Sequence, residues 1–594
     1  MRPIPAPFRS PDRRPFPEDT TMIRARRLVS LILLVALCAT GAGAQSADSA
    51  SATLVVPGRS VVSSRYGIVA TSHPLVSAVG VAILERGGNA VDAAIAANAT
   101  LGLMEPMNNG MGGDLFAIVY EAKTGKLYGL NASGWAPTGL TPELLASKGL
   151  ERVPRRGIYS VTVPGTVAGW DALRERFGTM GFDQLLAPAI YYSKNGFPVT
   201  EVTARMWQES ERTLEATPNA KSTFLIDGRA PREGEIFRNP DLAATLERIA
   251  GQGRDGFYTG PTADSILALS GAEGGTLTAQ DLSDFRAEWV EPLHTTYHGW
   301  TVYELPPNGQ GVAALEMLNI MERFPLAQYG FHSAKAMHVM IEAKKLAYAD
   351  LLRYVGDPRF SKIPVDQMIS KATGEARAKL IDESKAQCRV EPSQFSELTK
   401  AGSETIYMSV IDKDGNIVSL IQSNFSWFGS GLVAPHTGFA LQNRGSLFTL
   451  KPGQPNTLAP RHRSLHTIIP AFMEKDSTRI GFGIMGGFNQ AQAHAQFVAD
   501  IADYGLDIQR ALEAGRFTKL DFDGCDVQIE SRVPAATIDA LRALGHEVKV
   551  EAPRTDIFGF GQAVESTPDG VHHGASDPRH DGAAIPQPAP FGKP

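Results

Sequence analysis

The stretch GSETIYMSVIDKDGNIVSLIQSNF, residues 402–425, has the pattern of a β-hairpin. Two apolar-rich runs flank the tight-turn sequence DKDGN at residues 412–416, and an Asp-Gly pair between such runs favours a chain reversal. Thr405 opens the first run. A threonine is common where a strand begins, but a threonine that becomes a new chain terminus can act as a nucleophile. The choice between the two interpretations depends on the rest of the chain.

The composition is that of a large soluble globular protein. Of the 594 residues, 43% are hydrophobic and 20% charged, which is enough apolar material for one large core or two smaller ones. The net charge of -6 and the absence of a long basic run after the N-terminal region argue against a nucleic-acid partner. Composition alone does not indicate the substrate.

The N-terminal region has the pattern of a secretory signal peptide. A basic head at residues 22–27 precedes a short apolar run at 28–37, and the small residues AGA at 42–44 form a cleavage site. The apolar run is too short for a comfortable membrane span, although a retained signal anchor stays open as an alternative. We expect residues 1–44 to be a leader with its true start at Met22, no stable membrane insertion, and a periplasmic or secreted protein.

Cysteine and histidine usage gives no sign of a metal centre or a cofactor. Only Cys388 and Cys525 remain once the leader is removed, and the sequence leaves open whether they pair. No HExxH, CxxC or P-loop pattern is present. We expect no structural metal and no cofactor, and we expect His572, His573 and His580, in a Gly/Asp/Pro-rich stretch, to be solvated.

The order of the predicted elements favours an α/β layered fold. A hairpin is predicted at residues 114–133, helices dominate 165–249 and 312–352, strands are predicted again at 439–443, and residues 477–505 read as strand, glycine turn and helix. Central strands with helices outside are typical of layered α/β proteins.

Several segments, taken in order, resemble the gamma-glutamyltranspeptidase family of N-terminal-nucleophile (Ntn) hydrolases. They include SHPLVSAVGVAILERGGNAVDAAIAA at residues 72–97, EPMNNGMGGDLFAIVY at 105–120, ELPPNGQG at 304–311 and MSVIDKDGN at 408–416. The likeness begins near residue 66 and covers nearly the whole chain after the leader. It implies an αββα sandwich, made as a precursor that cuts itself into a large and a small subunit.

The family pattern places the self-cleaving threonine four residues before the serine of the SVxDKDGN segment. That serine is Ser409, so the resemblance implies cleavage of the Glu404–Thr405 bond. Residues 45–404 would form the large subunit and 405–594 the small subunit. Thr405 would then carry its own α-amine, with a reference pKa of roughly 7.7–8.0, as the base for its hydroxyl.

Three more catalytic positions carry over from the family. Ser423 stands where a threonine hydroxyl bonds the nucleophile; a simple cross-strand polar pair is the alternative. Gly486 and Gly487 match the glycines whose backbone N–H groups form the oxyanion hole, with an ordinary strand-to-helix turn as the alternative.

The predicted substrate pocket departs from the family. Ser133 stands where an arginine usually binds the glutamyl α-carboxylate, and His466 and Thr467 replace a pair of serines. Arg444 and Leu447 stand where acceptors for the α-amino group are usual, which favours an anionic acyl group over a zwitterionic one. For Arg444, a surface or subunit-bridging ion pair is the alternative.

The resemblance therefore implies an amide hydrolase of the gamma-glutamyltransferase and glutathione hydrolase type, acting on small molecules through a Thr405 acyl-enzyme. An acylase or amidase for glutaryl-type or small dicarboxylic monoamides is the alternative. The link at residues 449–467 is too short for the usual lid, which favours hydrolysis over transfer. A non-catalytic binding protein on the same fold is the alternative of another class. Assembly beyond the two subunits stays open.

Overall fold

The computed structural model describes residues 58–390, 404–553 and 555–591. The predicted leader, residues 1–44, lies outside these ranges. Within them, no helix combines the length and the apolar character that crossing a bilayer requires.

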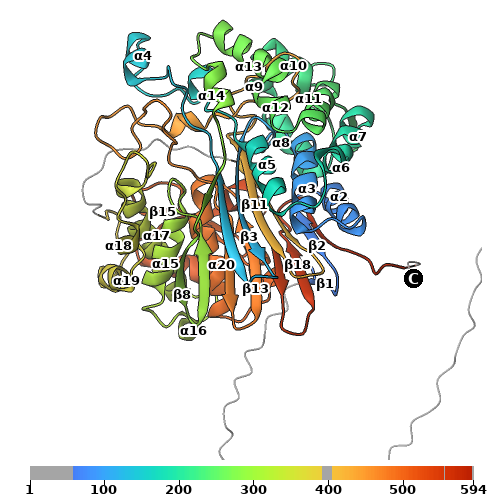
Figure 1. Cartoon of the computed structure of the whole chain (residues 1–594). Helices are drawn as coiled ribbons and strands as arrows, with labels where there is room; N and C mark the ends of the chain where they lie inside the picture. Colours follow the sequence, from blue (N-terminus) through green and yellow to red (C-terminus); the bar gives the residue numbers. More distant parts are fainter. Residues whose placement is uncertain (1–57, 391–403, 554, 592–594) are drawn as a thin grey trace, which may run out of the picture. The chain divides into compact units, whose positions relative to one another are not determined.

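Two antiparallel seven-stranded sheets form the centre of the protein (Figure 1). The first, which we call the hairpin sheet, has the order β19-β2-β10-β11-β3-β4-β7. Its strands, in chain order, are β2 (Ile68–Thr71), β3 (Asp114–Glu121), β4 (Lys126–Ala132), β7 (Glu288–Val290), β10 (Glu404–Ile411), β11 (Ile417–Phe425) and β19 (Ala583–Pro586). The predicted hairpins β10–β11 and β3–β4 are confirmed, and β10 and β11 lie at the centre of the sheet.

The second sheet, which we call the glycine-turn sheet, has the order β1-β18-β17-β13-β12-β9-β8. Its strands are β1 (Val62–Ser64), β8 (Leu293–Tyr297), β9 (Trp300–Glu304), β12 (Ala471–Lys475), β13 (Thr478–Ile484), β17 (Gly561–Ser566) and β18 (His572–Ser576). Strand β13 ends at the glycine turn that leads into helix α20 (Gln490–Ala502), as the sequence predicted.

The two sheets pack face to face through an apolar layer. Ile68, Phe116 and Tyr407 of the hairpin sheet meet Phe472 and Val564 of the glycine-turn sheet in this layer, and all five side chains are buried. Burial on both faces explains why β11 is apolar-rich along its whole length.

Helices cover the outer face of each sheet. Helices α2 (Pro74–Glu85), α3 (Ala90–Met104) and α5 (Thr166–Phe177) pack on the hairpin sheet, and α15 (Gly311–Met321) and α20 pack on the glycine-turn sheet (Figure 1). Helix α17 (Ala334–Tyr354) packs against α15. The architecture is the αββα sandwich of the Ntn-hydrolase type that the sequence predicted.

The remaining elements surround this frame. The other helices are α4 (Pro142–Ser147), α6 (Phe182–Leu185), α7 (Ala187–Asn195), α8 (Glu201–Glu209), α9 (Glu211–Leu214), α10 (Pro218–Phe224), α11 (Pro240–Gln252), α12 (Asp255–Tyr258), α13 (Gly260–Ala272), α14 (Ala279–Ser283), α16 (Leu326–Tyr329), α18 (Val365–Met368), α19 (Lys371–Ala378), α21 (Ile508–Glu513) and α22 (Ala535–Ala543). A small sheet holds β14 (Phe517–Thr518), β15 (Asp526–Glu530) and β16 (Glu547–Glu551), and a two-stranded pair holds β5 (Phe197–Pro198) and β6 (Ile236–Phe237).

Two sequence predictions are wrong. Residues 439–443 form no regular strand, only an isolated Val433–Ala440 bridge. The N–H groups of residues 441, 442 and 443 donate to the carbonyls of three separate segments, at Leu432, Gly112 and Asn424, so no single partner strand is present. Two of the three histidines expected in solvent are buried: His572 lies in β18, and His580 Nδ1 donates to the Ser72 carbonyl at 2.9 Å. His573, also in β18, is half-buried.

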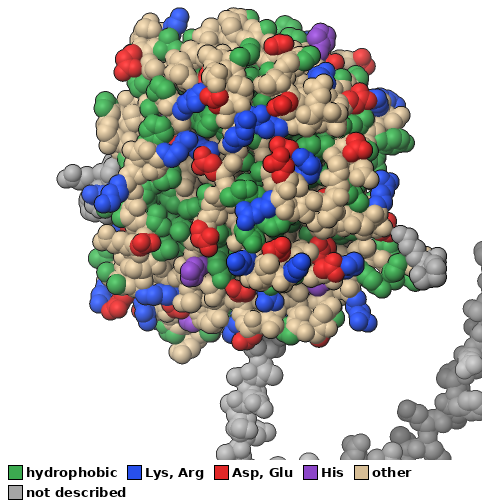
Figure 2. All heavy atoms as spheres, viewed as in Figure 1, with side chains coloured by type: hydrophobic (Ala, Val, Ile, Leu, Met, Phe, Trp, Pro, Cys, Tyr) green, Lys and Arg blue, Asp and Glu red, His purple; other side chains and the backbone are tan. Residues whose placement is uncertain are grey.

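On the face drawn in Figure 2, basic and acidic side chains lie interspersed and form no broad field of one sign. That face therefore offers no broad field of one sign that would attract a charged molecule.

The layer between the sheets should dominate the stability of the described fold. Replacing Phe472, which is fully buried and stacks on Tyr120 at 5.5 Å, by alanine should lower the free energy of unfolding by about 3–5 kcal/mol. Denaturant titration measures this loss. Tyr191→Ala, at a residue 61% exposed, is the matched control and should leave the unfolding midpoint near that of the wild type.

Candidate active site

Thr405 lies at the start of β10, buried next to the end of β11. Its Oγ1 donates to Ser423 Oγ at 3.1 Å, and only 1% of the residue is exposed. The pairing is irregular here: Glu404 is opposite Phe425, whereas Ile406 is opposite Gln422, so β11 holds one extra residue. Bulges of this kind re-aim side chains and are frequent beside active sites. The bulge brings the two hydroxyls together.

The Ser423 hydroxyl takes part in several hydrogen bonds. Besides the Thr405 hydroxyl, its Oγ accepts from the backbone N–H of Phe425 at 2.8 Å and from Arg444 Nη2 at 3.2 Å. Phe425 adopts a left-handed φ of 77°, and its N–H donates to the serine two residues earlier in the chain. A serine held from three sides can fix the direction of the Thr405 hydroxyl.

Gly486 and Gly487 form a turn with free donors. Both have positive φ, 124° and 59°, and both are buried. Neither backbone N–H has an acceptor among the described residues. Buried N–H groups without acceptors are rare in proteins and are suited to binding a developing oxyanion. The Gln310 side chain fixes the turn, because its Nε2 donates to the carbonyls of Gly487 and Thr467, at 2.7 and 2.5 Å.

Arg444 places a buried positive charge beside the hydroxyl pair. The residue begins a short 3-10 helix and is fully buried, with Nη1 donating to Thr467 Oγ1 at 2.6 Å. Its guanidinium lies 4.4 Å from the centre of the Phe425 ring. Among the described residues, no carboxylate forms an ion pair with Arg444 and its Nε has no acceptor, although the charge of nearby Asp114 acts to raise its pKa. Burial lowers the pKa of Arg444 to about 9, so it stays charged at neutral pH.

His466 is a neutral donor to Asp114. Its Nδ1 accepts from the backbone N–H of Ile468, so the proton is on Nε2, which donates to Asp114 Oδ2 at 2.9 Å. Burial, helped by the nearby Arg444, lowers the pKa of His466 to about 4. The Asp114 carboxylate also accepts from Gly134 N and from Gln442 Nε2, at 2.7 and 2.8 Å, so its oxygens are engaged by the protein itself.

Ser133 lies in a neighbouring buried network. Its Oγ donates to Asn131 Oδ1 at 2.7 Å and accepts from Asn308 Nδ2 at 3.3 Å. Asn308 also contacts the backbone of His466, because the Asn308 carbonyl accepts from the His466 N–H at 2.8 Å. Ser133 therefore supports the position of His466 through Asn308.

The structure brings Thr405, Ser423, Arg444 and Thr467 into one chain of hydrogen bonds and places the Gly487 turn next to it through Gln310. Sequence reasoning missed Asp114, Asn308 and Gln310 as members of this site. A signal was present: Asp114 lies in the segment at residues 105–120, and Asn308 and Gln310 lie in ELPPNGQG, both of which carry the resemblance.

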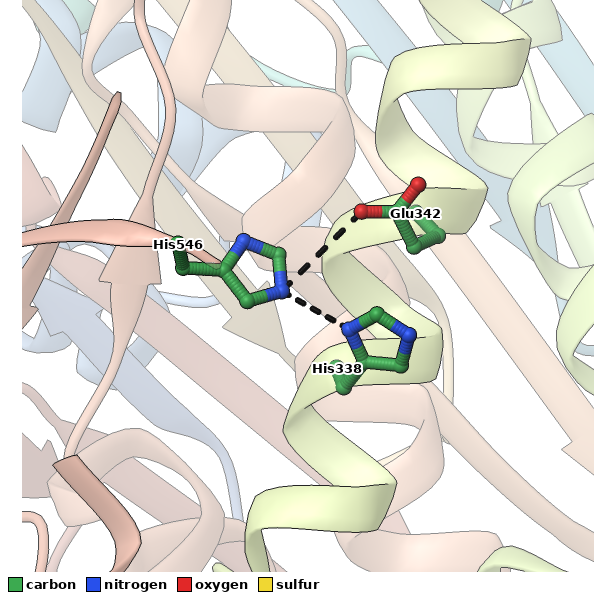
Figure 3. A group of neighbouring side chains, drawn as sticks. All are labelled: His338, Glu342 and His546. Carbon is green, nitrogen blue, oxygen red and sulfur yellow. Dashed lines mark hydrogen bonds and ion pairs between the residues drawn. The ribbon is translucent and has the colours of Figure 1, made fainter. Parts of the chain in front are cut away.

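A second polar cluster joins His338, Glu342 and His546, whose ligand-type atoms all lie within 4.8 Å of one another (Figure 3). His338 Nδ1 accepts from His546 Nε2 at 2.7 Å, because His338 Nε2 must donate to the Asp382 carbonyl. The Lys345 ammonium lies 2.7 Å from Glu342 Oε1 and already balances this carboxylate. The cluster is therefore better described as an internal hydrogen-bond network than as a metal centre.

A profile of the gamma-glutamyltranspeptidase family matches residues 76–587. The chain belongs to this family. It is 36% identical to the glutathione hydrolase-like YwrD proenzyme of Bacillus subtilis, over 89% of this chain and 99% of the relative. It is 35% identical to the oxamate amidohydrolase proenzyme of Klebsiella pneumoniae, over 88% of this chain and 98% of the relative.

Among solved structures, the cephalosporin acylase from Bacillus halodurans superposes with a TM-score of 0.84 at 40% identity, covering 91% of this chain and 99% of that chain. The predicted resemblance is confirmed, and so is the enzyme class. This family member is an amide hydrolase of the Ntn type, with acylase activity as the alternative to glutathione-type hydrolysis.

The neutral state of His466 gives a pH-dependent contribution to stability. Below pH 6.5 the unfolded chain binds a proton at this residue, whereas the folded protein does so only near pH 4, so folded stability falls between these values. His466→Gln removes this dependence. Denaturant unfolding measures the free energy of unfolding of the wild type and of His466→Gln at pH 7 and at pH 4.5. The decrease caused by the substitution should be about 2–3 kcal/mol smaller at pH 4.5 than at pH 7, because the wild type has by then lost that much stability itself. Phe472→Ala, which removes no titratable group, should cost the same at both pH values; an equal cost for His466→Gln would contradict the assignment.

Proposed function

We propose that the chain cuts its own Glu404–Thr405 bond and then hydrolyses, through an ester on Thr405, amides whose acyl group carries a carboxylate but no ammonium group. The observation that carries this proposal is the buried Arg444 guanidinium, which lacks a carboxylate partner among the described residues and shares the Ser423 hydroxyl with Thr405.

Self-cleavage would begin with attack of Thr405 Oγ1 on the carbonyl carbon of Glu404. The C–N bond of the peptide breaks as the C–O bond of an ester forms, and water then hydrolyses that ester. The products are a carboxylate on Glu404 and a free α-amine on Thr405, which gives a large subunit of residues 45–404 and a small subunit of 405–594.

In the mature enzyme, the α-amine of Thr405 would accept the hydroxyl proton as Oγ1 attacks the substrate amide. The N–H groups of Gly486 and Gly487 would stabilise the oxyanion that forms. The ammonium returns the proton to the leaving amine, and an ester remains on Thr405. Water, activated by the same amine, hydrolyses the ester and releases the acid.

Arg444 and Thr467 would bind the anionic end of the acyl group. A guanidinium can hold a carboxylate with two parallel hydrogen bonds, and burial makes each of them stronger. Leu447, the last residue of the 3-10 helix that Arg444 begins, is buried in the apolar core and offers no negative charge to a substrate ammonium. His466 and Ser133 would position this wall of the pocket. An oxamate amidohydrolase and a cephalosporin acylase among the relatives support an acyl group of this kind.

Hydrolysis of gamma-glutamyl amides is the second candidate, supported by the glutathione hydrolase proenzymes among the relatives. We place the mature enzyme in the periplasm or outside the cell. The leader pattern at residues 1–44 and the Cys388–Cys525 disulfide support this location.

Thr405→Ala should abolish both processing and turnover, because it removes the attacking oxygen. A reducing denaturing gel of the purified wild type should show two fragments, and sequencing of the smaller one should begin at Thr405. Thr405→Ser keeps a hydroxyl and should still be cut. A wild-type chain that stays whole and inert on long incubation would instead support a binding protein on this fold.

The charge of Arg444 should determine substrate preference. The wild type should hydrolyse glutaryl p-nitroanilide with a higher kcat/KM than gamma-glutamyl p-nitroanilide. Arg444→Gln should lower kcat/KM for the glutaryl compound about 30-fold or more, because the substrate carboxylate is then buried without a partner.

The uncharged butyryl p-nitroanilide is the control substrate. Arg444→Gln should change its kcat/KM far less, since it has no carboxylate to lose. Equal losses for both substrates would show that Arg444 acts only through Ser423. A strong wild-type preference for the gamma-glutamyl compound would favour the second candidate.

A further inference from the structure

The described chain contains a disulfide between Cys388 and Cys525, whose Cα atoms lie 4.4 Å apart and whose positions are 137 residues apart in sequence. Cys388 precedes Thr405 and Cys525 follows it. In the uncut chain the bond closes a loop, but after cleavage before Thr405 the same bond joins two polypeptides. We propose that this disulfide is the covalent link between the large and small subunits of the mature enzyme. The inference rests on the proposed self-cleavage.

The backbone around the bond aligns the two cysteines. The Cys388 carbonyl accepts from Gly524 N at 2.9 Å, directly next to Cys525. Two residues before Cys388, Ala386 N donates to the Leu544 carbonyl at 2.7 Å. Residues 386–388 of the large subunit therefore lie beside the small-subunit segments that precede β15 and follow α22. This backbone contact brings the sulfur atoms of Cys388 and Cys525 together.

The cluster in Figure 3 lies at the same junction. His338 and Glu342 are on α17 of the large subunit, and His546 follows α22 of the small subunit. Lys345 joins the cluster to the tail, because its Nζ donates both to Glu342 Oε1 at 2.7 Å and to the Gln387 carbonyl at 2.9 Å. The residue next to Cys388 is thus fixed to helix α17, so both sides of the disulfide are held in place.

The chain offers these cysteines no other partner. Of its three cysteines, Cys38 lies in the predicted leader, which leaves Cys388 and Cys525. Cys525 is buried, and Cys388 is exposed. Formation of the bond removes two protons and two electrons from the two thiols. An oxidant that carries a disulfide accepts them by thiol–disulfide exchange and leaves as two thiols.

The link would make refolding of the cut enzyme a unimolecular process. Two separate fragments must find each other, so their recovery depends on concentration, whereas linked fragments stay at a high effective concentration. In the native state, the sheets hold the fragments together without the disulfide, since β10 pairs with β2, β11 with β3, and β12 with β9.

Denaturing gels with and without dithiothreitol test the proposal on the purified wild type, with free thiols blocked before denaturation. Two bands with reductant and one band near the uncut chain without it are the expected result. Two bands under both conditions would overturn the link while leaving self-cleavage intact. One band under both conditions would instead overturn self-cleavage.

Variants separate these outcomes. Cys388→Ser and Cys525→Ser should each be processed and give two bands even without reductant, while still eluting as one complex from a native sizing column. Thr405→Ala with a specific protease site inserted within residues 391–403 tests the link without self-cleavage. After cutting by the added protease, its fragments should separate only with reductant; separation without it would overturn the proposal.

Refolding provides a second readout. Cut wild-type enzyme, unfolded in denaturant and diluted without reductant, should recover its native elution position to the same extent at all protein concentrations. The cut Cys525→Ser enzyme should recover less as the protein is diluted, because its fragments must meet. The same concentration dependence for both proteins would contradict a covalent link.

Discussion

Backbone pairing on both sides of the β10–β11 hairpin determines where Thr405 lies. Strand β10 is hydrogen-bonded to β2, and β11 to β3, so neither strand can slip without breaking its pairing with a second neighbour. A slip of one residue would also turn the whole apolar set of a strand to the wrong face. Within this fixed register, the extra residue of β11 places Ser423 under the Thr405 hydroxyl. The geometry of the site follows from the sheet.

The candidate site contains a buried positive charge, on Arg444, that a negatively charged substrate group could pair with. Burial of Arg444 costs several kcal/mol of lost hydration, and hydrogen bonds to two hydroxyls and contact with the Phe425 ring offset only part of that cost. Asp114 is nearby but accepts from His466, Gln442 and Gly134. The charge of Asp114 favours the charged form of Arg444 from a distance, but its oxygens are bonded to these other donors and make no ion pair with the guanidinium. An anionic acyl group would provide that direct contact.

Local pattern predicted the parts of the site that depend on neighbours in sequence. The hairpin with Thr405 and Ser423, and the strand–glycine–helix turn at Gly486, are visible in residue order because turn residues and apolar periodicity encode them. The network around His466 is not visible in this way. Asp114 and His466 are 352 positions apart, and only the assembled sheets bring them together. The pairing of Cys388 with Cys525 was left open for the same reason. Residues 439–443 have a strand-like composition but form no strand, since their backbone N–H groups donate to three separate segments of the chain.

The position of β2 has a consequence for how the two halves can be made. This strand of the N-terminal half lies between β10 and β19, which are the first and last strands of the C-terminal half. The halves are interleaved within one sheet, so neither has a complete hydrogen-bonded surface by itself. Exchange of halves between two enzyme molecules would require the hairpin sheet to come apart. As long as the protein stays folded, each mature enzyme should therefore keep the two pieces with which it was synthesised.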